Sequence, residues 1–304
     1  MPRRDAAWSG TAATALAVTV WGLGNVLVKH LALDGLTLAV DRLWIGAAVY
    51  LVANRLCGGR LSWMTIRLAA LGGVTFAADL GLFFVALRHT SVADATVIGA
   101  LQPALVLLVA RPLFGESVTA ADVALSGAGM LGVCVAVLGS APSAGRSVFG
   151  DLLAVGALLT FTGYFVASKQ ARTRLGAVEY QAALLLVAAA SLTPAVIVSG
   201  HPLLVPRPSD VGWAALIALV PGSGHLLVNW AHRSVPIMVV SLLTLGTPIV
   251  SIAGAAVLLG EPLTLVQVAG ILCALAGVGM VLVRSGASVP EPATDVAVSQ
   301  PAVE

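Results

Sequence analysis

The chain has 304 residues, of which 59% are hydrophobic and only 10% are charged, and its formal net charge is +2. Soluble globular proteins have about a quarter of their residues charged, so this composition excludes an ordinary soluble domain and indicates a membrane protein. The small net charge excludes nucleic acid as the main partner. Cys57, Cys134 and Cys273 lie far apart in or beside apolar segments. We expect three buried thiols, with no disulfide framework, no metal site and no cofactor.

Ten apolar segments are long enough to cross the hydrocarbon core as helices, which takes about 20 residues. They are residues 11–31, 38–57, 66–88, 92–113, 119–139, 149–169, 178–199, 210–231, 236–258 and 264–284. Residues 1–10 are predicted to be a cytoplasmic N-terminal segment. The basic start is not followed by a clear cleavage site, so the first segment is expected to be a retained span rather than a signal peptide. Residues 285–304 lack apolar periodicity and are predicted to be a disordered cytoplasmic tail.

Basic residues predict the orientation, because they gather in cytoplasmic loops. With the N-terminus inside, eleven lie on or near the cytoplasmic side: Arg3, Arg4, Arg55, Arg60, Arg67, Arg111, Lys169, Arg172, Arg174, Arg233 and Arg284. Four lie outside: Lys29, Arg88, Arg146 and Arg207. The chain is therefore expected to be a multi-pass protein of the plasma membrane with both termini in the cytoplasm. Arg42, near the outer end of the second span, is expected to form local structure with Asp41 or to contact lipid headgroups.

The sequence contains an internal repeat. Residues 113–123 (LFGESVTAADV) and residues 258–268 (LLGEPLTLVQV) share Leu, Gly, Glu, Thr and Val at positions 145 residues apart. Pro103 and Gly132 recur as Pro248 and Gly277 at the same offset. The repeats, residues 11–139 and 149–284, each contain five spans. Because five is odd, the second copy must enter the membrane from the opposite side. The predicted fold is an all-α membrane protein of ten transmembrane helices in two inverted five-helix repeats, as in secondary transporters that alternate access to a central site.

The repeated motif favours a structural role over substrate binding. Thr119 with Asp122, and Thr264 with Gln267, have the spacing of capping boxes at the starts of spans 5 and 10. Glu116 precedes the first of these helices and Glu261 the second. We expect each carboxylate to favour the positive end of the dipole of the helix that follows it.

The order of these motifs resembles a known family. Ten spans, two related halves and the repeated proline, glycine-glutamate and threonine pattern are similar to EamA-type members of the drug/metabolite transporter superfamily. VWGLGNVLVK (residues 20–29) resembles the tryptophan-glycine signature of that family's first helix, and ALRHTSVADA (residues 86–95) resembles its link between spans 3 and 4. The second copy, TFTGYFVASK, departs from the signature at Phe161 and Thr162. The resemblance covers about residues 10–284 and implies export or exchange of metabolites, amino acids or drugs, with spans 1, 3, 4, 6, 8 and 9 around a central cavity.

Polar residues deep in the predicted spans are candidate substrate-binding residues, because such groups must face protein or water. Gln102 and Thr247 each precede a proline at equivalent depth in spans 4 and 9. The prolines free backbone carbonyls, which are tolerated where they line a cavity. Two packing kinks, with Gln102 bonded to a neighbouring helix, are the alternative.

Span 8 carries Ser223, His225 and Asn229 beside Pro221, Gly222 and Gly224. This proline and the two glycines are expected to weaken or break the helix near the middle of the membrane, and broken helices of this kind mark transport sites.

Span 3 holds Asp79, the one acid predicted deep in the membrane. It could carry a proton that couples transport to a pH gradient, or it could fix two helices together by pairing with His225 or a backbone donor. In span 1, Trp21 could stack on a substrate and Asn25 could hydrogen-bond to it. Packing of span 1 across Gly22 and Gly24 is the alternative. Tyr164 in span 6 completes the candidate set.

Function classes other than transport fit less well. PGSGH (residues 221–225) is similar to the serine motif of intramembrane proteases, but Pro221 replaces the required glycine and no second deep span carries a histidine. The chain is therefore not expected to be an enzyme. A channel-like facilitator remains the main alternative, because a fixed pore could also use polar residues at this depth. The expected partners are a small-molecule substrate and the lipid bilayer, and no feature of the sequence indicates an oligomeric state.

Overall fold

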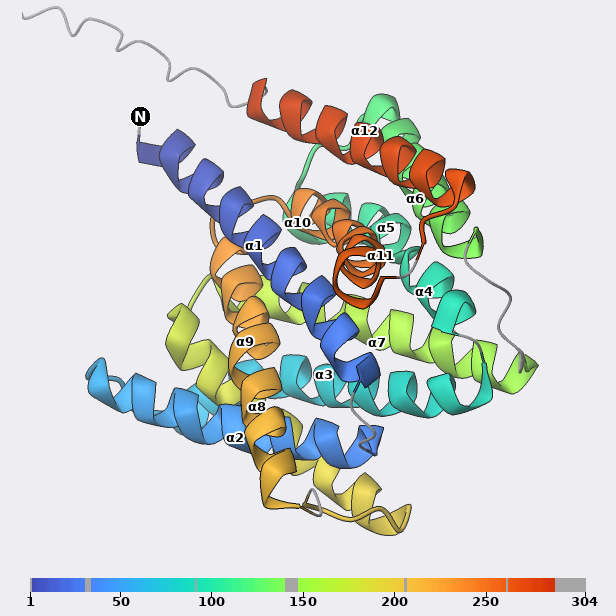
Figure 1. Cartoon of the computed structure of the whole chain (residues 1–304). Helices are drawn as coiled ribbons and strands as arrows, with labels where there is room; N and C mark the ends of the chain where they lie inside the picture. Colours follow the sequence, from blue (N-terminus) through green and yellow to red (C-terminus); the bar gives the residue numbers. More distant parts are fainter. Residues whose placement is uncertain are drawn as a thin grey trace, which may run out of the picture.

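The structure is a computed structural model that describes residues 2–30, 34–90, 92–139, 147–204, 207–260 and 262–287. Every regular element in these residues is an α-helix, so the predicted all-α class is confirmed there (Figure 1). The helices are α1 (Pro2–His30), α2 (Gly35–Leu56), α3 (Trp63–His89), α4 (Val92–Gly99), α5 (Gln102–Phe114), α6 (Ala120–Leu138), α7 (Val148–Ala171), α8 (Ala177–Val198), α9 (Pro208–Ala231), α10 (Ile237–Leu243), α11 (Gly246–Leu259) and α12 (Leu265–Ala287).

The predicted spans all coincide with helical segments. Nine stretches of the described chain are long and apolar enough to cross a membrane, and the tenth predicted span is α12, whose apolar stretch Leu265–Val281 is shorter. Helix α1 already begins at Pro2, so most of the predicted N-terminal segment continues the first helix. Residues 288–304 of the predicted tail lie outside the described residues. The thiols differ from expectation, since Cys57 and Cys273 are exposed on the protein surface and Cys134 is half-buried.

Spans 4 and 9 are each divided into two helices near their centres. Helix α4 ends at Gly99 and α5 begins at Gln102, while α10 ends at Leu243 and α11 begins at Gly246. Pro103 and Pro248 fall in the first turns of α5 and α11, where their missing N–H groups cost least. The two breaks therefore lie at equivalent positions of the sequence repeat.

Span 8 is not broken, contrary to the prediction. Helix α9 runs without interruption through Pro221, Gly222 and Gly224. The physical reason is the packing of α1. A Cβ added at Gly224 would lie 2.5 Å from Trp21 Nε1, and one added at Gly24 would lie 2.6 Å from the Pro221 ring. These glycines allow α1 and α9 to approach closely, which is the packing alternative considered for span 1.

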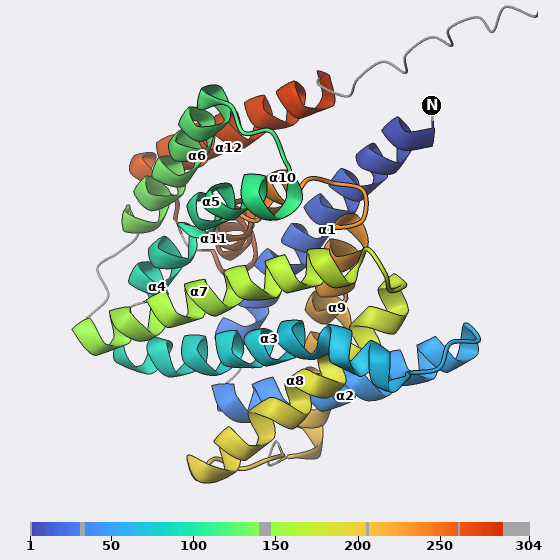
Figure 2. The same cartoon turned by 180° about the vertical axis from the view of Figure 1, so that it is seen from behind.

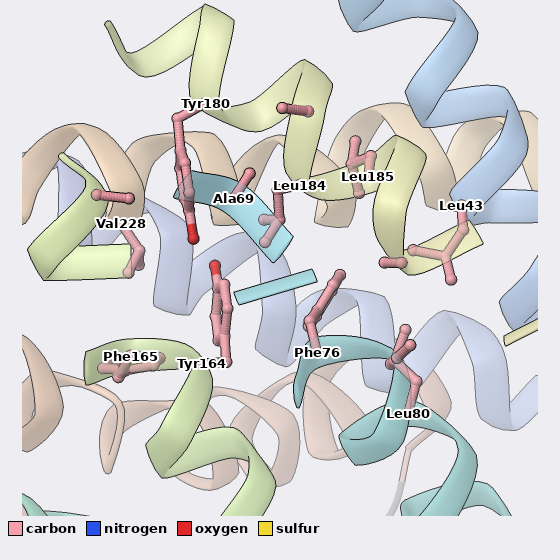
Figure 3. Packing of buried hydrophobic residues seen from close by; sticks show 14 of the residues in the cluster. Leu43, Ala69, Phe76, Leu80, Tyr164, Phe165, Tyr180, Leu184, Leu185 and Val228 are labelled. Atoms are coloured by element: carbon pink, nitrogen blue, oxygen red, sulfur yellow. The ribbon is translucent and has the colours of Figure 1, made fainter. Parts of the chain in front are cut away.

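The helices pair across the two predicted repeats. Helix α1 packs along α9, α3 along α7, α2 against α8 and α6 against α12, and these pairs are visible from both sides (Figures 1 and 2). Both views also place the start of α1 and the end of α12 at the same side of the molecule. The largest buried apolar cluster lies where α2, α3, α7 and α8 meet (Figure 3).

Glycines bring the backbones of α6 and α12 into contact. A Cβ at Gly132 would lie 2.4 Å from Ala274 N, and one at Gly270 would lie 2.4 Å from Ala136 N. A Cβ added at Gly277, the repeat partner of Gly132, would likewise lie 2.8 Å from Gly129 N. The recurrence of Gly132 as Gly277 is thus explained by one helix-helix interface that both repeats build.

The repeated motif ends one helix and starts the next. Gly115 and Gly260 cap α5 and α11 with left-handed φ angles of 64° and 69°, a conformation that glycine adopts without strain. The predicted capping boxes are confirmed. Asp122 N donates to Thr119 Oγ1 at 3.2 Å, and Thr119 N to Asp122 Oδ2 at 2.9 Å. In the second copy, Thr264 N donates to Gln267 Oε1 at 2.8 Å, and Gln267 N to Thr264 Oγ1 at 3.1 Å.

Glu116 does not serve the helix that follows it, so that prediction is wrong. Its carboxylate accepts hydrogen bonds from Ile237 N at 2.7 Å and Met238 N at 3.3 Å, the first amides of α10 in the other repeat. Lys169 Nζ lies 2.8 Å from the same carboxylate and also donates to Val235 O at 2.8 Å. The loop bends towards α10 because the free amides of that helix have no other partner within it. Glu261 lies outside the described residues.

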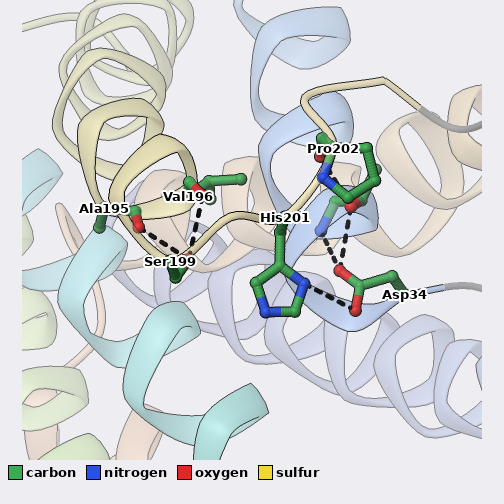
Figure 4. Close-up of polar contacts among 7 residues, drawn as sticks. Asp34, Ala195, Val196, Ser199, His201 and Pro202 are labelled. Atoms are coloured by element: carbon green, nitrogen blue, oxygen red, sulfur yellow. Dashed lines mark hydrogen bonds and ion pairs between the residues drawn. The ribbon is translucent and has the colours of Figure 1, made fainter.

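A second polar cluster joins the two repeats at the start of α2 (Figure 4). Asp34 Oδ2 accepts from Thr37 N at 2.9 Å and so caps α2, while His201 Nδ1 lies 3.0 Å from Asp34 Oδ1. Thr37 Oγ1 donates to Pro202 O at 2.8 Å. The predicted topology places these two loops on one side of the membrane, and the structure brings them into contact.

Candidate solute-binding site

His225 lies at the centre of an aromatic cluster formed by four helices. Its ring centroid is 4.7 Å from that of Trp21 on α1, 4.6 Å from Phe76 on α3 and 5.9 Å from Tyr164 on α7. Trp21 is held in place by a hydrogen bond from its Nε1 to Pro221 O, at 3.0 Å. Only 8% of His225 is exposed. Three of the predicted site residues, Trp21, Tyr164 and His225, are therefore brought together.

A chain of polar groups continues from this cluster. The Tyr164 hydroxyl lies 3.4 Å from His225 Nδ1 and donates to Asn229 Oδ1 at 3.2 Å. Asn229 Nδ2 donates to Gln181 Oε1 on α8 at 2.8 Å. Figure 3 shows the Tyr164 hydroxyl pointing towards that of Tyr180, which is bonded to Ser168 Oγ at 2.8 Å. Asn229 thus joins the candidate site through a network that spans α7, α8 and α9.

Two opposite charges border this cluster. Asp79 on α3 is partly exposed and lies close enough to Arg42 on α2 for their charges to interact. Arg42, Phe76, Gly222 and His225 line a cavity of about 10 Å³, enough space for roughly one water molecule. The expectation that Arg42 contacts lipid headgroups is therefore wrong, because its side chain lines an internal cavity shared with α9. The alternative in which Asp79 pairs directly with His225 is not seen.

The remaining predicted site residues lie apart from His225. Gln102 is buried and accepts hydrogen bonds from Ser241 Oγ at 2.9 Å and Thr244 Oγ1 at 3.1 Å, so it bonds to the neighbouring broken span, as the packing alternative proposes. Its Nε2 has no partner in the described structure. The Thr247 hydroxyl is also buried without one.

Asn25 and Ser223 face other groups. Asn25 is exposed and donates to Ser251 Oγ on α11 at 3.3 Å. Ser223 bonds within its own helix, to Val220 O at 2.7 Å. These two side chains therefore lie outside the polar network that joins Tyr164, Asn229 and His225.

Sequence reasoning missed Arg42, Phe76 and Gln181. Gln181 and Phe76 sit inside long apolar segments, and only the spatial pairing of α3, α7 and α8 shows that they meet Tyr164 and Asn229. Gln181 could have been singled out, because it is an amide near the start of a span and such groups need partners. In the part of the chain that the structure describes, no cluster of three His, Cys, Asp or Glu residues could hold a metal ion.

The helices and the buried polar cluster define a multi-pass helical membrane protein with an internal site at the meeting point of its two sequence repeats. Residues 8–138 and 148–283 match the EamA-like transporter family, and the chain belongs to this family. The chain is therefore a multi-pass membrane protein of a transporter family, and the expectation that it is not an enzyme is confirmed by this family membership.

Two other proteins are similar to this chain in sequence or in fold. A probable terminal-alkyne amino-acid exporter of Streptantibioticus cattleyicolor is 37% identical over 82 residues, which span 27% of this chain and 28% of the exporter. A protein crystal structure superposes with a TM-score of 0.76 and 23% identity, covering 91% of this chain and 99% of the other. The second likeness concerns the fold alone.

Proposed function

We propose that the chain is a secondary transporter that exports or exchanges a small amphipathic solute, such as an amino acid, by alternating access. The two five-helix repeats would be inverted and would rock against one another in the plasma membrane, with both termini in the cytoplasm. The pairing of α1 with α9 and of α3 with α7 supports this, because each pair exchanges the first and third spans of the two repeats. The name of the partial relative supports export of an amino acid.

One observation carries the proposal. Side chains from both repeats gather around His225 and Tyr164. Trp21 and Phe76 of the first repeat contact the His225 ring, and Asp79 of the same repeat lies close enough to Tyr164 for its charge to act on it. Tyr164 and Asn229 of the second repeat complete the polar network. Such a mixture of apolar surface and a few polar groups is typical of a small-molecule site. A site built from both halves is also what rocking of the halves would open to each side in turn.

Asp79 would couple transport to protons. Its carboxylate lies inside the membrane-crossing part of α3, and its charge interacts with Arg42 from α2 and with Tyr164 from α7, while Arg42 in turn acts on His225 from α9. A carboxylate at this depth is costly unless it has a function or a partner. Proton binding on one side of the membrane and release on the other would then drive exchange.

Proteoliposomes test these proposals. The purified protein, loaded with unlabelled amino acid, is expected to show saturable counterflow of the labelled compound. Asp79→Asn is expected to abolish the stimulation by a pH gradient while the protein still inserts and elutes as the wild type does. If a pH gradient stimulates uptake by Asp79→Asn as much as by the wild type, proton coupling is refuted. Conductance without saturation would favour a channel. The cavity of about 10 Å³ beside His225 is too small for a hydrated solute to pass in this conformation, which favours a carrier.

A further inference from the structure

Arg42 and Asp79 are opposite charges that interact without touching. Each contributes to the electrostatic environment of the other. Among the described residues, no guanidinium nitrogen of Arg42 lies within 4.0 Å of a carboxylate oxygen of Asp79, so the two do not form a direct ion pair. No hydrogen bond to either side chain is found among the described residues. The guanidinium therefore keeps five donors unused, and the carboxylate keeps its acceptors unused.

Another pair of largely buried opposite charges in the same protein does form a direct ion pair. Lys169 and Glu116 are only partly exposed and lie 2.8 Å apart, with further bonds to backbone groups of α10 and the loop before it. Unpaired charges are costly in a membrane, and direct pairing is the usual solution. Because Arg42 and Asp79 stop short of pairing, their hydrogen-bonding capacity is available to a third group that carries both charges.

The surroundings of Arg42 fit the rest of such a group. The cavity beside it is lined by apolar side chains, Leu43, Phe76 and Leu185, together with Gly222 and His225. A Cβ added at Gly222 would meet only Ile217 O, at 3.5 Å, so this wall has space for one methyl-sized group. Trp21 packs against His225, with the ring centroids 4.7 Å apart.

We propose that Arg42 and Asp79 form the head-group subsite for a zwitterionic α-amino acid, in which Arg42 binds the carboxylate and Asp79 binds the ammonium group. This inference rests on the proposed transport function. The planar guanidinium fork matches a carboxylate with two parallel hydrogen bonds, and a carboxylate accepts well from an ammonium group. The cavity holds only about one water molecule in this conformation, so its apolar wall would receive an aliphatic side chain once the carrier opens.

The two opposite charges also explain selectivity. A solute with only a carboxylate would leave Asp79 without a partner, and a solute with only an ammonium group would leave Arg42 without one. Each mismatch leaves an uncompensated charge inside the membrane, which discriminates against the wrong solute. Because ammonium and proton would compete for Asp79, proton binding at this carboxylate would release the solute.

The experiment compares leucine and two of its derivatives by competition against labelled leucine on the purified full chain. Leucine has both charges, leucinamide has only the ammonium group, and N-acetylleucine has only the carboxylate. In the wild type, leucine is expected to compete about tenfold to a hundredfold better than either relative, as one charge-assisted interaction allows. Arg42→Gln is expected to lose this preference over leucinamide, and Asp79→Asn to lose it over N-acetylleucine. Arg60→Gln, an exposed arginine beyond the end of α2, is the control and should behave as the wild type.

The double variant Arg42→Gln/Asp79→Asn leaves no unpaired charge and guards against loss of folding. It is expected to elute and melt as the wild type does and to prefer uncharged N-acetylleucinamide over leucine. Equal competition by all three compounds in the wild type, or equal losses for all three in both single variants, would overturn the subsite while leaving transport of other solutes intact. Absence of counterflow for every solute of a metabolite panel would instead overturn the proposed function itself.

Discussion

The interface between α6 and α12 provides a test in which two known effects oppose each other. Replacing Gly132 with Ala should raise the helix propensity of α6 by up to about 1 kcal/mol. The added Cβ would lie 2.4 Å from Ala274 N and 2.7 Å from Gly270 O, both backbone atoms that cannot rotate away. Ordinary contacts between carbon atoms are about 3.5–4.0 Å, so the helices must separate by roughly 1 Å. Overpacking of this kind costs about 1–3 kcal/mol.

Gly127 on the same helix is the matched control. A Cβ there would meet no atom within 4 Å, so Gly127→Ala keeps the propensity gain without the clash. The difference in unfolding free energy between the two alanine variants should therefore be about 1–3 kcal/mol, with Gly132→Ala the less stable. Gly277→Ala should have an intermediate unfolding free energy, because its added Cβ would lie 2.8 Å from the nearest atom, Gly129 N. Gly279→Ala should be as stable as Gly127→Ala, because a Cβ there would also meet no atom within 4 Å. Reversible unfolding in mixed detergent micelles gives the four values. Equal stability of Gly132→Ala and Gly127→Ala would show that the two backbones do not touch as described.

Two further substitutions test the polar contacts. Glu116→Gln should lower the unfolding free energy by about 1.5–3 kcal/mol, because Lys169 and the first amides of α10 lose a charged acceptor. Thermal unfolding measures this loss. The double variant Glu116→Gln/Lys169→Met should recover part of it. No recovery in that pair would mean that the ion pair contributes little. Tyr164→Phe should cost about 1–3 kcal/mol, because Asn229 Oδ1 loses its donor, and should raise the KM for counterflow. Tyr50→Phe is the control, since no hydrogen bond of the Tyr50 hydroxyl is found among the described residues. If Tyr50→Phe lost as much unfolding free energy as Tyr164→Phe, the role given to the Tyr164–Asn229 hydrogen bond would be contradicted.

The helices and the repeat could be predicted from the sequence because they depend on local signals. Span length follows from runs of apolar residues, and the caps at Thr119 and Thr264 follow from residue type and spacing alone. The breaks of spans 4 and 9 were predictable for the same reason, since Pro103 and Pro248 lack a donor wherever they stand. Pro221 has the same chemistry, yet α9 continues, because that outcome depends on how α1 packs against it.

Long-range contacts limited what could be predicted of the site. Arg42 was expected at a membrane boundary because the second span was placed at residue 38, but α2 begins at Gly35. Arg42 is thus about 10 Å along the helix from its start, far enough to reach the interior. Glu116 was assigned to the next helix in sequence, whereas its partner is α10, more than a hundred residues away. Nothing in one repeat alone indicates which amides of the other lie nearby.

The two polar clusters that join the repeats lie in loops that the predicted topology places on opposite faces of the membrane. The ion pair of Glu116 and Lys169 lies at the start of α10, and the ion pair of Asp34 and His201 joins the loop between α8 and α9 to the start of α2. A carrier that opens one face at a time would need to break only one of these two ion pairs in each half of its cycle. The relative strength of the two would then set which face is open when no solute is bound, so weakening either should bias the resting carrier towards that side.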